Sequence, residues 1–229
     1  MPESGRPGYP PSFEDVLEKA AQLQEIVPGA VLVGGSAAAF HARHRVSLDD
    51  DHVVADLAQS FDTVLDNLEA VGEWSTARVQ PGKIILGELG GIETGVRQMV
   101  RSRPLETTEA SIRGKRLTVP TAAEILRIKA WLVLSRNQSR DHLDIAALSD
   151  HLGLDAAAEV LRGIDAYYAD VNHRPEAVAT QVARQLADPR PRDPEVTRQL
   201  ASYRELEPRW HDWKVVLEVL AAVAERMTR

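Results

Sequence analysis

Two short stretches carry most of what this sequence says about its fold, VLVGGSAAAF at residues 31–40 and RVSLDDD at residues 45–51. The apolar run over 30–33, which ends at a pair of glycines, predicts a short buried strand. The Ala-rich residues 36–44 then predict a short helix, and residues 48–57 predict a second strand. The order strand, glycine turn, helix and strand is typical of an α/β unit.

The second stretch places carboxylates next to each other. Alternate residues of a strand face the same side, so we expect Asp49 and Asp51 to point together with Asp50 opposed. Two neighbouring carboxylates repel each other unless a cation lies between them. Because Mg²⁺ favours one or two carboxylates together with substrate phosphates, the pattern predicts a magnesium site. The alternative interpretation is an acidic surface turn.

The first stretch offers a place for phosphate. Gly34, Gly35 and Ser36 end a predicted strand and open a helix, where backbone N–H groups can hold an anion. The alternative is a plain tight turn. A phosphate-holding turn about a dozen residues before a metal-holding Asp pair is the combination that metal-assisted phosphoryl or nucleotidyl transfer needs.

The rest of the first half alternates between helix and strand patterns. Ser12 followed by Asp15 predicts a capped helix that runs to about residue 26. Apolar residues at helical spacing predict another helix over 61–71. Strand patterns follow, separated by glycine turns, over 76–80, 83–89 and 92–99, and a hairpin around Gly114 over 112–119.

After Pro120 the pattern becomes helical. Helices are predicted over 121–135, 139–152, 155–171, 175–186, 194–206 and 210–227, with a linker over 187–192. We therefore expect an α+β chain with a loose N-terminus over 1–11, a small mixed-sheet α/β domain over 12–120 and an α-helical domain over 121–229.

Two of these predicted helices carry charges on their apolar faces. In the helix over 121–135, Lys129 lies in the middle of the apolar stripe, and Arg136 continues it. Asp141 lies on the apolar stripe of the next helix. A buried charge requires a partner, so the three residues are expected either to form a buried ion pair or to line a cleft. The alternatives are basic side chains that reach along the stripe to water, and an Asp that merely favours a helix start.

These motifs together resemble a known family. The strings LVGGSA at 32–37 and HRVSLDDD at 44–51 look like the active-site motif of the DNA polymerase β-like nucleotidyltransferase superfamily. More narrowly they resemble the AbiEii-type toxins, including the mycobacterial MenT group. EILRIKA at 124–130 and RDHLD at 140–144 are similar to the second signature of the same family, a lysine helix followed by Arg-Asp-x-x-Asp. The resemblance covers about residues 30–152 and implies a nucleotidyltransferase domain followed by the α-helical domain.

The resemblance implies a metal site that binds Mg²⁺. Asp49 and Asp51 match the family's metal ligands. A third carboxylate is expected, and Glu93 is the candidate because it would share a strand face with Arg97. Glu88 is the alternative to Glu93, and a solvent-exposed strand Glu is the other interpretation of either residue.

The resemblance also implies catalytic and nucleotide-binding residues outside the metal site. Lys129 matches a residue that contacts a phosphate, and Asp141 matches the carboxylate of the helical domain, so both are expected to be catalytic. The expected nucleotide-binding residues, which match the turn, the positions beside the metal and the second signature, are Gly34, Gly35, Ser36, Arg45, Ser47 and Arg136.

Composition excludes several other classes. The chain has 229 residues, no cysteine and a net charge of −7, which excludes thiolate zinc sites and a Cys nucleophile and disfavours a basic nucleic-acid binder. Neither a signal peptide nor a membrane span is predicted, so a cytoplasmic location is expected. Residues 97–116 hold six basic residues against two acidic ones, and this segment is the expected approach for an acceptor.

The sequence therefore favours a Mg²⁺-dependent enzyme that moves a nucleoside monophosphate from an NTP to an acceptor hydroxyl. The family resemblance further implies a toxin of a toxin–antitoxin pair that acts on tRNA 3′ ends and is restrained by a cognate antitoxin protein. The alternatives are transfer to a protein or a small molecule, a non-catalytic nucleotide-binding module, and an interaction protein whose helical half does the work.

Overall fold

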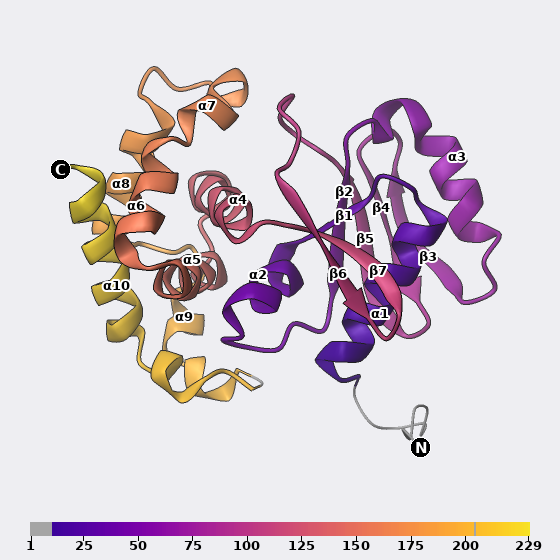
Figure 1. Ribbon diagram of the computed structural model, residues 1–229, viewed down its shortest axis with the longest axis horizontal. Helices are drawn as coiled ribbons and strands as arrows, with labels where there is room; N and C mark the ends of the chain where they lie inside the picture. The colour runs from indigo at the N-terminus through magenta and orange to yellow at the C-terminus, as the bar shows by residue number, and fades with distance from the viewer. Residues whose placement is uncertain (1–10, 204) are drawn as a thin grey trace.

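The computed structural model describes residues 11–203 and 205–229 (Figure 1). The expected loose N-terminus falls almost wholly on residues 1–10, which lie outside the described part. The first half consists of α1 (Phe13–Ile26), β1 (Val31–Val33), α2 (Gly34–Ala42), β2 (Asp50–Val54), α3 (Leu57–Glu69), β3 (Trp74–Gln80), β4 (Ile84–Leu89), β5 (Ile92–Gln98), β6 (Thr107–Ile112) and β7 (Lys115–Pro120).

Five of these strands form one mixed sheet in the order β1-β2-β5-β4-β3. β2 pairs with β5 in parallel, and the other neighbours are antiparallel. β6 and β7 form a separate two-stranded ribbon, which turns at Arg113-Gly114. The expected mixed sheet is confirmed, and the expected hairpin is longer than its pattern indicated.

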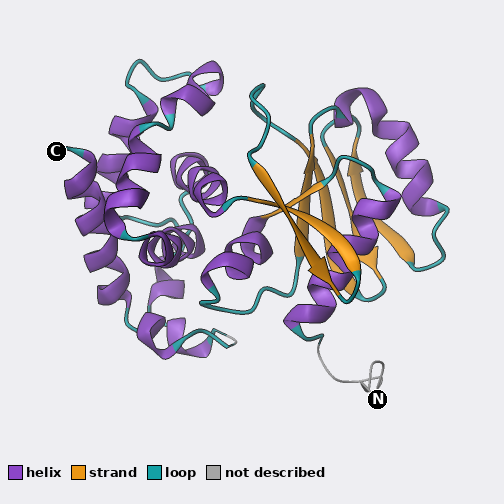
Figure 2. Ribbon diagram, in the orientation of Figure 1, coloured by secondary structure: helices purple, strands orange, loops and turns teal. Residues whose placement is uncertain are grey.

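The second half is helical, and Figure 2 shows it beside the sheet. Its helices are α4 (Ala122–Ser135), α5 (Ser139–Leu152), α6 (Leu154–Arg162), α7 (Asp165–Tyr168), α8 (Val178–Ala187), α9 (Pro194–Thr197) and α10 (Trp213–Met227). Short 3₁₀ turns lie at Ala169–Val171, Leu200–Ser202 and Pro208–His211.

Two predicted helices of this half are wrong as continuous elements. The helix over 155–171 is broken at Gly163, where α6 ends and a turn leads into α7. Glycine is a poor helix former, and this one stops the helix despite apolar residues at helical spacing beyond it. In the described residues of the helix predicted over 194–206, which leave out residue 204, the structure has the single turn of α9 and a short 3₁₀ turn.

Local sequence signals explain where the two best-specified helices start. Ser12 Oγ accepts from the Asp15 backbone N–H, and the Asp15 carboxylate accepts from the Ser12 N–H, so the capping box of α1 is complete. Thr121 caps α4 by accepting from the Glu124 N–H. The Glu124 carboxylate does not return the contact, because it forms ion pairs with two arginines instead.

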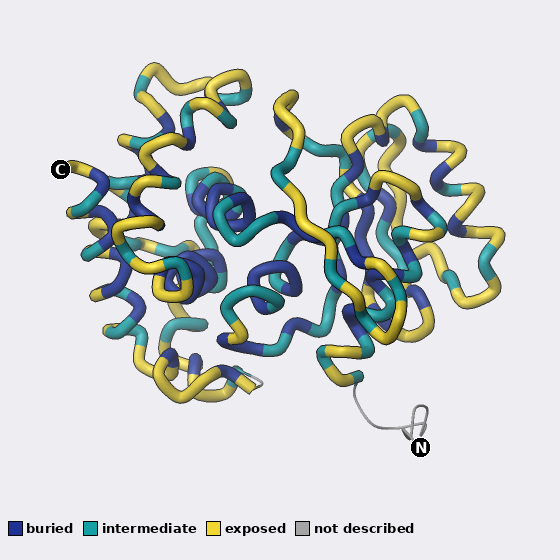
Figure 3. Tube along the Cα trace, in the orientation of Figure 1, coloured by how far each residue is buried: buried dark blue, intermediate teal, exposed yellow. Residues whose placement is uncertain are grey.

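The apolar core has two parts. One cluster lies between the sheet, the C-terminal end of α1 and α3. The larger cluster joins α2, β7 and the first half of α1 to the helices after residue 120. Figure 3 shows α4 and α5 as largely buried helices, and α2 packs against both of them. The chain changes from strands to helices at Pro120, while its core continues across that point.

Within the described residues, we find no helix with the length and the hydropathy needed to cross a bilayer.

Candidate active site

Asp51 occupies a position that glycines keep open on two sides. It pairs with Val33 on β1 and with Gly95 on β5. A Cβ added at Gly95 would lie 2.7 Å from Asp51 Oδ1, and one added at Gly34 would lie 3.2 Å from Asp51 Oδ2. Gly34 also has φ +72°, a conformation that favours glycine. Any side chain at Gly95 would therefore displace the Asp51 carboxylate.

Asp49 lies immediately before β2, which begins at Asp50 and not at the predicted residue 48. Ser47 Oγ donates to Asp49 Oδ1 at 2.7 Å, which holds the carboxylate. Ser36 Oγ donates to the Asp49 backbone carbonyl at 2.5 Å. Asp50 lies between the two acids and is buried in the opposite direction, as the alternation predicts.

The start of α2 lies against these acids. Gly34, Gly35 and Ser36 are its first three residues, and no side chain caps its N-terminal N–H groups. A Cβ at Gly35 would lie 2.5 Å from Arg45 Nη2 and 2.6 Å from Ser47 Oγ. Glycine at this position therefore lets the 45–47 segment close onto the helix start.

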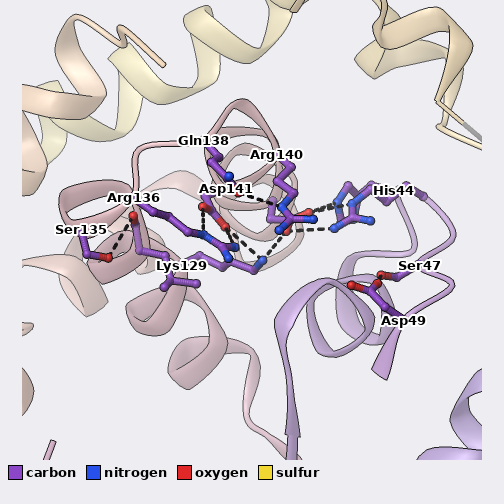
Figure 4. A network of polar contacts seen from close by, with 12 residues as sticks. His44, Ser47, Asp49, Lys129, Ser135, Arg136, Gln138, Arg140 and Asp141 are labelled. Carbon is purple, nitrogen blue, oxygen red and sulfur yellow. Dashed lines mark hydrogen bonds and ion pairs between the residues drawn. The ribbon is translucent and has the colours of Figure 1, made fainter. Parts of the chain in front are cut away.

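A buried ion network joins this region to the helical half (Figure 4). Its centre is Asp144 on α5, whose side chain is fully buried. Arg45 donates to both oxygens of Asp144, at 2.9 and 3.2 Å. His44 Nε2 lies 2.8 Å from Asp144 Oδ1, and Lys129 Nζ lies 2.6 Å from Asp144 Oδ2.

Lys129 extends the network to a second carboxylate. Its Nζ also lies 3.3 Å from Asp141 Oδ1, and only 1% of the Lys129 side chain is exposed. Arg136 contacts the same carboxylate through two hydrogen bonds of 2.7 Å. The charges on the apolar faces of α4 and α5 therefore form a buried ion network, which was one of the two expected outcomes. Lys129 lies within this network rather than at an open surface.

Charge decides which of these groups are ionised. Burial alone would raise the pKa of Asp144, but the charges of Arg45 and Lys129 and the His44 contact hold that pKa well below its ordinary value. Burial lowers the pKa of His44, against the opposing effect of Asp144. His44 is therefore neutral at pH 7, and its role is the structural one of supporting Asp144.

Arg136 is the most exposed cation of the network. Its side chain is 36% exposed, in contrast to Lys129. Burial opposes its charge, but Asp141 and then Asp51 raise the pKa of Arg136 above its ordinary value. The influence of Asp51 places both groups within electrostatic range of each other.

The expected third carboxylate is not drawn into a cluster. Glu93 and Glu88 face each other across β5 and β4, and Glu93 shares its strand face with Gly95, so both candidates lie on the side of the sheet that carries Asp51. Over residues 11–203 and 205–229, no three His, Asp or Glu side chains gather closely enough to hold one metal ion. Of the expected metal ligands, Asp49 and Asp51 are the two whose carboxylates are positioned by neighbouring residues, Asp49 by Ser47 and Asp51 by the space at Gly34 and Gly95.

The segment from Arg97 to Arg116 does not provide the basic approach expected from its composition. Arg101 is buried and forms an ion pair with Glu124, with its Nη2 2.5 Å from Glu124 Oε1. Arg113 pairs with three acidic residues of α1. Most of the positive charge in this segment is therefore neutralised within the fold. Arg97 differs from these residues in its partner, because its Nε lies 3.3 Å from Oδ1 of Asp51, an expected metal ligand.

A cavity of about 360 Å³ opens at the C-terminal end of α2, with Phe13, Phe40, Arg43 and Arg45 among its lining residues. Neither Asp49 nor Asp51 lines it, so this cavity is separate from the expected metal ligands.

Sequence analysis missed three residues of this region. Asp144 ends the second signature and was given no role of its own, although its position three residues after Asp141 puts both on one helix face. Gly95 gave no local signal, and Arg97 gave none for its contact with Asp51, because both depend on the pairing of β5 with β2. That pairing joins strands about forty residues apart in the chain and is decided by tertiary structure.

Known proteins resemble this chain in two ways: solved structures share its fold, and curated proteins are similar in sequence to part of it. No family model matches the chain. A stretch of 112 residues, 46% of this chain, is 43% identical to the heme uptake protein MmpL11 of Mycobacterium tuberculosis H37Rv. That stretch covers 11% of MmpL11, so the chain spans about a tenth of the length of the curated relatives it matches.

Two solved structures from Helicobacter pylori share the architecture. A "putative nucleotidyltransferase" is 15% identical with a TM-score of 0.52, over 94% of this chain and 93% of that one. JHP933 is 15% identical with a TM-score of 0.50, over 93% of this chain and 89% of that one. The chain therefore shares the fold of these two proteins, an α+β arrangement with a mixed sheet and a helical half.

Proposed function

We propose that this chain is a Mg²⁺-dependent nucleotidyltransferase, which moves a nucleoside monophosphate from an NTP to an acceptor hydroxyl. The observation that carries the proposal is the position of Asp51, held between Gly34 at the start of α2 and Gly95 on β5. Asp49 stands beside it, fixed by two serines. The nucleotidyltransferase fold supports the same conclusion.

The two acids fit a hard divalent cation. Both offer carboxylate oxygens, which Mg²⁺ prefers, and both side chains are only partly buried. A cation bound there would stabilise charge on the transferred phosphate and lower the pKa of the acceptor hydroxyl. Asp49 and Asp51 are the proposed ligands, with Glu93 or Glu88 as a third.

The chain also offers groups for the phosphates. The uncapped N–H groups at Gly34, Gly35 and Ser36 form the positive end of α2, which favours an anion. Arg136 is partly exposed and within electrostatic range of Asp51, so we propose that it contacts the nucleotide. Lys129 and Asp141 then act by holding Arg136 and the two halves of the chain in place.

For the acceptor we propose a tRNA 3′ end, which is what the AbiEii and MenT resemblance implies. The chain would then act as a toxin in the cytoplasm, and a cognate antitoxin would restrain it. Transfer to a protein or a small molecule uses the same metal and phosphate groups, so the acceptor has to be identified by experiment.

The test is transfer of label from each of four α-³²P NTPs, with Mg²⁺, into total tRNA, protein and small-molecule fractions. Asp51→Asn and Arg136→Gln proteins are run alongside, with the exposed Arg190→Gln as a matched control. We expect label in tRNA that Asp51→Asn abolishes and Arg190→Gln leaves unchanged. Label in another fraction would retain the chemistry and replace the acceptor. No Asp51-dependent label in any fraction would overturn the proposal.

A further inference from the structure

Arg97 is a cation beside the proposed metal ligand Asp51, and the proposed reaction assigns it no role. It lies on β5, two residues after Gly95, and pairs with Val53. Because β2 and β5 are parallel and in register, Asp51 and Arg97 point to the same face of the sheet. Arg97 Nε reaches back to within 3.3 Å of Asp51 Oδ1.

The contact exists because Gly95 leaves the space between them open. A Cβ at Gly95 would lie 2.7 Å from Asp51 Oδ1 and 3.8 Å from Arg97 Nε. The same glycine therefore lets the carboxylate sit at this position and lets the guanidinium reach it.

This ion pair differs from those in the buried network. The Arg97 side chain is 45% exposed and the Asp51 side chain 29%, whereas Asp141 and Asp144 are fully shielded. Exposed ion pairs contribute little to stability, and solvent can separate them easily. Among the described residues, Asp51 is the one carboxylate with which Arg97 forms an ion pair.

We infer that Arg97 exchanges partners during the reaction cycle, an inference that rests on the proposed function. In the free protein its guanidinium neutralises Asp51 and competes with a divalent cation for that carboxylate. When metal and NTP arrive together, the cation replaces Arg97 at Asp51, and Arg97 turns to the triphosphate. A guanidinium suits this second role because its planar donors match phosphate oxygens.

Partner exchange predicts opposite effects from one substitution. Removing the guanidinium in Arg97→Gln frees Asp51, so the affinity of the nucleotide-free protein for Mn²⁺ should rise by about threefold to tenfold. The same protein loses a phosphate contact, so its affinity for inorganic tripolyphosphate in the presence of Mg²⁺ should fall by about tenfold. A purely structural role would shift both affinities in one direction or neither.

The experiment measures Mn²⁺ binding by electron paramagnetic resonance and Mg²⁺–tripolyphosphate binding by calorimetry. The matched control is Arg78→Gln, because Arg78 is exposed on β3 and pairs with Leu86, which puts it on the same sheet face two strands farther from Asp51. Arg97→Lys should restore part of the tripolyphosphate affinity. Asp51→Asn should abolish Mn²⁺ binding.

The outcomes separate this inference from the function beneath it. Opposite shifts in Arg97→Gln, absent in Arg78→Gln, support partner exchange. Asp51-dependent binding of Mn²⁺ and tripolyphosphate that Arg97→Gln leaves unchanged, or shifts in one direction, overturns partner exchange and leaves the proposed function standing. If the wild-type protein shows no Asp51-dependent binding of either probe, the proposed function fails as well.

Discussion

Lys129 Nζ lies 2.6 Å from Asp144 Oδ2, and both side chains are almost completely shielded from water. Lys129 comes from α4 and Asp144 from α5, while Arg45, which shares Asp144, comes from the segment between α2 and β2. The half that contains the sheet and the helical half are therefore joined by a buried charge network as well as by a common apolar core.

Asp144→Asn should destabilise the protein strongly. Removing this charge leaves Lys129 and Arg45 with less compensation in a buried environment, so the free energy of unfolding should fall by about 3 to 5 kcal/mol. The measurement is denaturant unfolding at pH 7. Asp150→Asn, which breaks an exposed pair with Arg209, is the control and should cost less than about 1 kcal/mol. Equal losses in the free energy of unfolding would show that the buried network contributes no more to stability than an exposed ion pair does.

Gly95→Ala should reduce the rate of nucleotide transfer more than it reduces the stability of the fold. The added Cβ would lie 2.7 Å from Asp51 Oδ1, so the carboxylate must move. A displacement of about 1 Å at a reacting site can cost about 100-fold in rate, and we expect a loss of that order in nucleotide transfer. Gly72→Ala is the control, since nothing lies within 4 Å of its added Cβ. Normal transfer by Gly95→Ala would refute the placement of the metal at Asp51.

Lys129 and Arg136 should separate stability from nucleotide binding. Lys129→Gln removes a fully buried cation and should lower the free energy of unfolding by about 3 to 5 kcal/mol. Arg136→Gln removes a partly exposed one and should lower affinity for Mg²⁺–tripolyphosphate by about tenfold with a smaller loss of stability. Calorimetry and thermal unfolding of both proteins test this division. The reverse pattern would return the phosphate contact to Lys129.

Stability should fall as pH drops below 6.5. Burial lowers the pKa of His142 from its ordinary value of 6.5 to about 4, against the opposing charges of Asp141 and Asp193. The folded state holds His142 neutral, so its contribution is complete above pH 6.5 and is lost as the pH falls toward 4. The loss is on the order of 3 kcal/mol over that interval. His44 shifts in the same direction.

The check is urea unfolding of His142→Gln between pH 7 and pH 4. Its stability should vary less with pH than that of the wild-type protein, because glutamine does not titrate. His173→Gln, at an exposed position, serves as the control and should follow the wild-type curve. If the stability of His142→Gln varied with pH as steeply as that of the wild-type protein, the result would contradict the lowered pKa of His142.

Local patterns predicted the parts of the site that lie close together in the chain. The glycine turn, the opposite burial of Asp50 and Asp51 and the charges on the apolar faces of α4 and α5 each depend on spacings of a few residues. Such spacings are visible without knowing which strands pair. The reach of Ser36 to the Asp49 carbonyl also follows from the short path between α2 and β2.

The rest depended on pairing between distant segments. Gly95 and Arg97 matter only because β5 lies parallel to β2, and the charges near Arg101 and Arg113 are neutralised by residues on other elements. Composition alone therefore overestimated the basic character of that segment. The break at Gly163 has a local cause instead, because glycine is a poor helix former and ends α6 despite the apolar periodicity.

The most direct test of the central claim compares two labels on one NTP, taken as the base that gives transfer in the four-way assay. Nucleotidyl transfer at Asp49 and Asp51 predicts that α-³²P enters the acceptor while γ-³²P leaves in pyrophosphate, with Mg²⁺ required and with both Asp49→Asn and Asp51→Asn inactive. Entry of γ-³²P into the acceptor, or transfer of α-³²P that survives both substitutions, would contradict it.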